Sequence, residues 1–154
     1  KGVADWLAIR LVVDSVAIPV VANGDIQNLS DARQCLEKSG ARAVMAGRAA
    51  LGKAWLPAAI QRGLTTQGEA IAPVAAIKRD AAIEHYDGLL SLYGRNAGIR
   101  HARKHVAAYL ADACAGAPHR LASHRAALTS ETPEDVVRHL REAFDNAEPE
   151  ALAA

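Results

Sequence analysis

Two short apolar runs, each ending at a polar corner that contains glycine, constrain the fold of this chain more than any other feature. The first run, "IPVVA" at residues 18–22, is followed directly by Asn23, Gly24 and Asp25. The second, "RAVMAG" at residues 42–47, ends at Gly47 and is followed by Arg48. Neither run alternates between apolar and polar residues, which is typical of strands buried on both faces of a parallel sheet.

Helical patterns surround the two runs. Residues 5–16 place apolar side chains at helical spacing, with Asp5 as the expected N-cap. A second helix is predicted to begin after Ser30, its expected N-cap, and to end at Gly40. A third runs through "AWLPAAIQR". The order helix, strand, helix, strand, helix with short connections predicts parallel strands joined by a right-handed crossover.

The pattern changes after Gly63, where "LTTQGEAIAP" is polar and broken. Helices follow, and the last has Thr132 as its expected N-cap, Pro133 at its first position and acidic residues in its first turn. The predicted helices of this part lie at about 75–92, 98–114, 118–128 and 133–145. The sequence therefore predicts an α/β part at 1–63, a linker at 64–74, an all-α part at 75–145 and a flexible tail at 146–154.

Composition narrows the class of protein. A hydrophobic fraction of 51% with 23% charged residues fits a globular protein that buries a core. No run approaches the roughly 20 apolar residues that cross a bilayer, and no signal-peptide pattern opens the chain, so no membrane partner is expected. Cys35 and Cys114 lie far apart without metal-ligand spacing, which favours a reducing, cytoplasmic setting and two inert thiols.

The two glycine-containing corners share features of an anion-binding site. Parallel strands carry their functional loops at their carboxyl ends. Glycine lets the backbone approach an anion, and Arg48 adds positive charge. Asp25 would repel an anion, so it is expected to hold the loop or to accept a hydrogen bond from a ligand hydroxyl. From the residues alone two interpretations stay open: an anion site, or an ordinary turn followed by a close-packing glycine.

A basic block occupies the stretch from Tyr93 to Arg125, where the only acid is Asp112. Its cations are Arg95, Arg100, Arg103, Lys104, Arg120 and Arg125. Such a block is typical of nucleic-acid backbone contact, although a charged helix face is often simply solvated. The histidines show no metal-ligand spacing with acids or cysteines, so no metal site is predicted.

The helix at 98–110 carries the centre of this block. Its expected buried stripe consists of Ile99, Ala102, Val106 and Leu110. Arg100, His101 and Lys104 then fall on the opposite side. Arg103 lies near the edge of the stripe, where it could instead pair with an internal acid or carbonyl.

Three stretches in the same order, "IPVVANGDI", "DARQCLEKSGARAVMAGRAALGKAWL" and "HYDGLLSLYGRNAGIRHARKHVAAYL", resemble the C-terminal portion of a bacterial tRNA-dihydrouridine synthase. The resemblance extends from Lys1 to about Phe144. It implies the last two βα units of a TIM (β/α)8 barrel followed by a C-terminal helical bundle domain. It also implies FMN as cofactor, NADPH as reductant, and reduction of a tRNA uridine to 5,6-dihydrouridine.

The resemblance also implies roles for particular residues. Asn23, Gly24 and Asp25 fall on the family's FMN-binding loop after strand seven, and Gly47 and Arg48 fall on the phosphate-binding turn after strand eight. The helical domain is expected to bind tRNA. The contacts expected there are Arg100, Arg103 and Lys104.

A full barrel takes roughly 250 residues, whereas this sequence contains only two of its strands. We therefore expect a piece of a longer protein whose catalytic cysteine lies elsewhere, so that the chain alone is inactive. Uncovered strands would also allow self-association. Two alternatives remain: a non-catalytic RNA-binding module, or another phosphate-binding barrel enzyme acting on a small metabolite.

Overall fold

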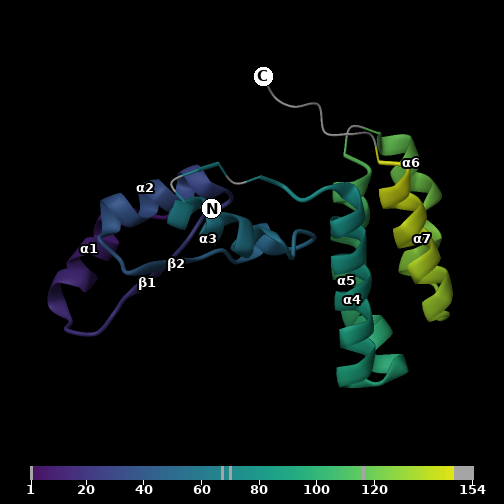
Figure 1. The fold of residues 1–154 in the computed structure, drawn as a ribbon. Coiled ribbons are helices and arrows are strands. Elements are labelled where there is room, and N and C mark those ends of the chain that lie inside the picture. The colour runs from purple at the N-terminus through teal and green to yellow at the C-terminus, as the bar shows by residue number, and fades with distance from the viewer. Residues whose placement is uncertain (1, 67, 70, 116, 148–154) are drawn as a thin grey trace. The chain divides into compact units, whose positions relative to one another are not determined.

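The computed structural model describes residues 2–66, 68–69, 71–115 and 117–147. The chain divides into two compact units (Figure 1). The first is built from the residues up to Ala50 and from Trp55–Ala72, and the second from Leu51–Ala54 and the described residues from Pro73 onward. Most of the expected tail, residues 148–154, lies outside the described residues.

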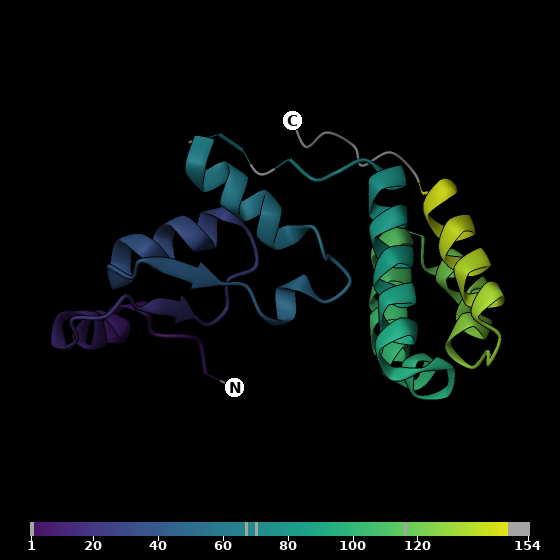
Figure 2. The same ribbon diagram turned by 60° about the horizontal axis from the view of Figure 1, so that its bottom comes forward.

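The first unit is a small α/β layer structure. Its elements are α1 (Trp6–Ser15), β1 (Val21–Asn23), α2 (Leu29–Ser39), β2 (Ala43–Met45), the 3-10 turn η1 (Arg48–Ala50) and α3 (Leu56–Thr66). Strands β1 and β2 run parallel, with Val21 opposite Ala43 and Asn23 opposite Met45 (Figure 2). The predicted order of elements and the parallel pairing are confirmed.

Alanine and cysteine provide four of the six buried residues in the core of this unit, which lets helices and strands approach closely. The buried residues of this core are Ala22, Ile26, Ala32, Cys35, Ala41 and Ile60. Trp6, Ile9 and Val13 of α1 pack against it. Ala22 is 1% exposed, whereas Val21 is 58% and Met45 49% exposed. The expectation of strands buried on both faces is therefore wrong for the described chain, because helices cover only the face that carries Ala22.

Local chemistry explains where the elements begin and end. Asp5 caps α1 as predicted, accepting from the N–H groups of Leu7 and Ala8. The cap of α2 is Asn28, not Ser30: its backbone is extended and its side chain accepts from the N–H of Asp31, so Ser30 already lies inside the helix. Strand β1 begins three residues later than predicted, because Pro19 has no N–H to donate and pairing starts at the Val20 carbonyl.

The second unit consists of helices. Its elements are α4 (Ala75–Tyr93), α5 (Arg95–Ala113), α6 (Pro118–Ser123), the 3-10 helix η2 (Arg125–Leu128) and α7 (Pro133–Asp145). Helices α4, α5 and α7 pack on one another (Figure 1). Gly98 lets α5 begin close to the end of α4, since a Cβ there would lie 2.8 Å from the Leu90 Cα. Helix α5 accordingly starts three residues before the predicted position.

Helix α7 turns an apolar stripe toward the core of this unit. Val136, Leu140 and Phe144 are buried and Val137 is half-buried. The helix predicted at 118–128 is interrupted, because α6 ends at Ser123 and the chain continues through His124 into η2.

Two boundaries differ from the sequence prediction. Helix α3 continues to Thr66, so the expected linker begins inside a helix. Leu51–Ala54 belongs with the helical unit and not with 1–63. Gly52 has φ 76°, and a Cβ there would lie 2.6 Å from the Ala108 backbone of α5, so the segment lies directly on that helix.

None of the described helices combines the length and the apolar character that a bilayer span requires.

Candidate functional site

The two glycine corners meet at the carboxyl ends of the parallel strands. Asn23 ends β1 and is followed by Gly24 and Asp25, while Gly47 and Arg48 follow β2. The Arg48 guanidinium donates to Oδ1 of Asp25 at 3.4 Å, which links the two corners. We call these five residues the strand-end corner. The structure thus brings together all the residues that the sequence singles out for anion or cofactor binding.

The first half of the strand-end corner is held by Ala4 and by Trp6, the first residue of α1. Gly24 has φ 132° and Asp25 has φ 51°. The Gly24 carbonyl accepts from the Trp6 indole N–H at 2.9 Å, and Oδ2 of Asp25 accepts from the Ala4 N–H at 2.8 Å. Asp25 therefore holds the loop, one of the two roles expected for it.

The second half of the strand-end corner is open. A Cβ on Gly47 would meet no heavy atom closer than Oδ1 of Asn23 at 4.0 Å, so an anion can approach the backbone there. The Arg48 side chain is 83% exposed and can turn toward a ligand, since its only described ion pair is the one to Asp25. This geometry fits an anion such as a phosphate group better than it fits a cation, because the exposed charge is positive.

A second candidate surface lies on α5. Ile99, Ala102, Val106 and Leu110 are buried as predicted. On the outer side, Arg100, Arg103 and Lys104 are exposed, and the described residues offer none of them a hydrogen bond or ion pair. We call these three residues the basic face. The expected pairing of Arg103 with an internal acid or carbonyl is absent among the described residues.

Other members of the basic block have internal partners. Arg95 donates to the Glu131 carbonyl at 3.2 Å, and Arg120 donates to the Ala143 carbonyl at 3.1 Å. Both residues therefore connect elements of the helical unit. The His101 ring lies against Tyr93, with 4.6 Å between ring centroids, at the edge of the basic face.

Neither cysteine is placed for chemistry. Cys35 is 0% and Cys114 4% exposed, and burial raises the pKa of both thiols above the ordinary value. A raised pKa keeps a thiol protonated and unreactive. The prediction that Cys35 is a small buried hydrophobe is confirmed.

The sequence missed one cluster. His124, His139 and Glu142 offer two ring nitrogens and a carboxylate oxygen within 4.8 Å of one another. His139 and Glu142 are three residues apart on α7, a spacing that puts them on one helix face. That pair could have been noticed, but its approach to His124 depends on how α7 packs.

The fold and the strand-end corner define a parallel α/β unit that can accept an anion at its carboxyl edge, followed by a helical unit with a basic face. The sequence model of the family described as "Dihydrouridine synthase (Dus)" matches residues 1–148. The chain belongs to this family.

Curated relatives give the same result. A "Probable tRNA-dihydrouridine synthase" of Rickettsia conorii is 48% identical over 109 residues, 71% of this chain and 33% of its own length. One from Rhodobacter capsulatus is 42% identical over 147 residues, covering 96% and 44% of the two chains. The "tRNA-dihydrouridine synthase B" of Shewanella oneidensis is 44% identical over 111 residues, covering 71% and 34%. The chain thus spans between a third and just under half of the length of these relatives.

Proposed function

We propose that this chain is the C-terminal part of a cytoplasmic tRNA-dihydrouridine synthase, an oxidoreductase that reduces a tRNA uridine to 5,6-dihydrouridine. The observation that carries the proposal is the strand-end corner, in a chain of the dihydrouridine synthase family. The two parallel strands would then be the last two of a TIM barrel, and α4 to α7 a helical bundle domain.

The strand-end corner would hold the phosphate end of FMN. Gly47 leaves room for the phosphate beside the backbone, and Arg48 would neutralise its charge. Asn23 lies beside that space and would donate to the ligand through its side-chain amide. Gly24 and Asp25 shape the loop, through the contacts to Ala4 and Trp6.

When bound, FMN would supply the hydride for the uridine ring, with NADPH as the reductant. The two buried thiols do not suit the delivery of a proton to that ring. The catalytic cysteine would therefore lie in another part of the enzyme, and this chain alone would be inactive. Val21 and Met45, which are exposed here, would face the rest of the barrel or a second copy of the chain.

The basic face would contact the tRNA backbone. Three adjacent cations without described internal partners suit phosphate groups, and such contacts read the shape of RNA and not its sequence. The rings of Tyr93 and His101, tilted by 38° to each other, would add aromatic faces for a nucleobase beside the basic face.

The proposal is tested on the protein purified from its natural source. We expect visible flavin absorption and NADPH-dependent reduction of uridine in tRNA. In that protein, Arg48→Gln should weaken FMN binding by about ten- to a hundredfold, the effect of losing one charge-assisted contact. The matched control is Arg62→Gln, an exposed arginine of the same unit. A colourless protein that reduces no uridine would overturn the proposal.

A further inference from the structure

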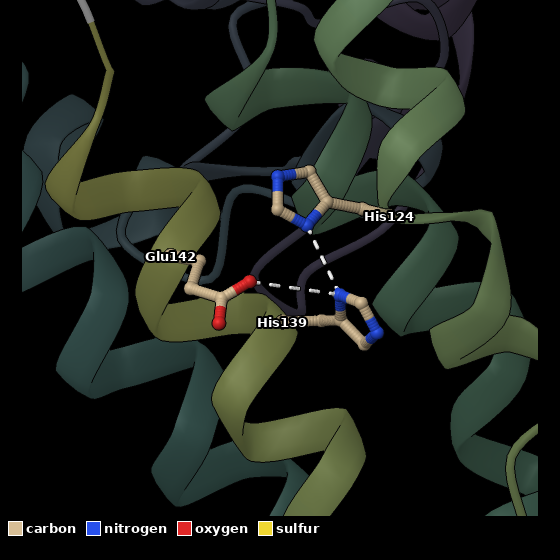
Figure 3. A group of neighbouring side chains, drawn as sticks. All are labelled: His124, His139 and Glu142. Atoms are coloured by element: carbon tan, nitrogen blue, oxygen red, sulfur yellow. Dashed lines mark hydrogen bonds and ion pairs between the residues drawn. The ribbon is translucent and has the colours of Figure 1, made fainter.

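His124, His139 and Glu142 form a cluster where the junction of α6 and η2 packs on α7 (Figure 3). His124 lies between α6 and η2, while His139 and Glu142 lie one turn apart on α7. The two Nδ1 atoms are 3.2 Å apart, and Nδ1 of His139 is 3.9 Å from Oε2 of Glu142. Figure 3 shows Nδ1 of His139 linked by dashed lines to Nδ1 of His124 and to the Glu142 carboxylate.

Two of the three side chains of the cluster are buried, although both are polar. His124 is 7% and His139 9% exposed, whereas the Glu142 side chain is 46% exposed. Burial and the neighbouring His139 lower the pKa of His124 below its ordinary value. The two Nδ1 atoms face each other at 3.2 Å, so when neither of them carries a hydrogen their two lone pairs point into the same space. A divalent cation would use both lone pairs at once.

The distances suit a small transition-metal ion. Zn²⁺ binds histidine nitrogen and carboxylate oxygen at about 2.0–2.2 Å, so tetrahedral ligands lie about 3.3 Å apart. The 3.2 Å separation of the two nitrogens is close to this value, whereas the carboxylate oxygen, 3.9 Å from His139, would move inward through rotation of the exposed Glu142 side chain. Two imidazoles and a carboxylate also form a known zinc ligand set, one that leaves a fourth position for water.

Charges around the cluster leave one carboxylate oxygen for the ion. Oε1 of Glu142 accepts from Arg138 at 3.3 Å, while Oε2 is directed toward His139. The positive charge of Arg120 also acts on His124 and opposes a cation, but its guanidinium donates to the Ala143 carbonyl. The net ligand charge of the three groups is −1 when both rings are neutral.

We propose that His124, His139 and Glu142 form a zinc-type divalent metal site that ties the α6–η2 junction to α7. The ion would bring two nitrogens and one oxygen together and keep water as its fourth ligand. This proposal does not depend on flavin or tRNA binding, since it concerns only the helical unit.

The experiment titrates Zn²⁺ into the metal-stripped 154-residue chain, by calorimetry and by competition with a chromogenic chelator. We expect one Zn²⁺ per chain. His124→Ala and His139→Ala should each weaken binding at least about 100-fold, because a direct ligand matters more than the outer contacts that cost 10–100-fold. His119→Ala is the control, since His119 is an exposed histidine of the same unit outside the cluster.

Two further measurements distinguish the loss of a metal ligand from the loss of the fold. Glu142→Gln changes an exposed side chain and should weaken Zn²⁺ binding by about tenfold or more with an unchanged helical circular dichroism spectrum. Co²⁺ bound to the unmodified chain should give the visible absorption of a tetrahedral ion. Absence of saturable Zn²⁺ binding, unchanged affinity in Glu142→Gln, or an octahedral Co²⁺ spectrum would each overturn the site.

Discussion

Gly24 has a backbone conformation and a neighbour that exclude a larger residue. Its φ is 132°, and a Cβ would lie 2.6 Å from the Cβ of Ala4. We expect Gly24→Ala to lower the free energy of unfolding by about 1–3 kcal/mol through backbone strain, with the clash added to it. Urea unfolding measures the difference. Gly2→Ala is the control, because a Cβ on Gly2 meets nothing within 4 Å. Equal stability of the two variants would contradict the loop geometry.

His105 should make stability depend on pH. Burial, then the charges of His85 and Lys104, lower the pKa of His105 in the folded chain. The unfolded chain keeps a value of about 6.5. Above that pH the His105 ring is neutral in both the folded and the unfolded chain. As the pH falls through it, the ring takes up a proton in the unfolded chain, whereas its lowered pKa resists protonation in the folded chain. Stability is therefore full near neutral pH and is lost on acidification.

The measurement compares the free energy of unfolding at about pH 7.5 and about pH 5.5, the range over which histidine titrates. His105→Gln should reduce the loss between the two conditions. His119→Gln, a change of an exposed histidine, should leave the loss as in the unmodified chain. A pH dependence that is identical in all three chains would argue against the assignment to His105.

At the scale of single residues, the sequence predicts a residue's role well where that role depends only on its neighbours along the chain. Asp5 caps α1 and Gly40 ends α2 in a left-handed conformation, as their residue types indicate. Asn28 and Ser30 are both good caps by type, and only the backbone decides that Asn28 is used. The approach of His124 to His139 is invisible in the sequence, because 15 residues and a helix break separate them.

Helix α7 packs against α4, α5 and η2, and Leu140 is its most deeply buried branched residue, with 0% exposure. Leu140→Ala should lower the free energy of unfolding by about 2–5 kcal/mol, because the cavity can close only in part. Thermal and urea unfolding both report the change. Leu92→Ala is the matched control, since Leu92 is 73% exposed, and it should change stability by no more than about 0.5 kcal/mol.

Element boundaries show why periodicity is a partial guide. The pattern of α7 predicts Pro133–Asp145 correctly, because a proline start and a clear apolar stripe agree. The break at His124 was missed, since alanine-rich sequence on both sides is compatible with a continuous helix. The open face of β1 and β2 also escapes prediction, because an apolar run predicts burial without saying what covers it.

For the molecule as a whole, the proposed function predicts that the basic face controls the salt dependence of tRNA binding. Changing Arg100, Arg103 and Lys104 to glutamine should reduce the slope of log affinity against log salt by about 2–3, near one unit per phosphate contact. Filter binding at several salt concentrations measures it in the natural protein. Arg141→Gln is the control, because Arg141 is an exposed arginine on α7. This variant should change the slope by less than glutamine at Arg100, Arg103 or Lys104 alone. An unchanged slope in the triple variant would contradict an RNA contact there.

The allocation of Leu51–Ala54 to the helical unit has a consequence for how proteins of this family can be rearranged by recombination. The four residues are encoded between β2 and α3, yet they lie on α5, where Gly52 meets Ala108 and Lys53 pairs with Asp112 at 3.6 Å. A gene fusion that joins a foreign α/β unit to this chain at residue 73 would supply the helices without Leu51–Ala54, the segment that packs on α5. Exchange of whole modules within the family should therefore succeed only when the loop before α3 and the surface of α5 are inherited together.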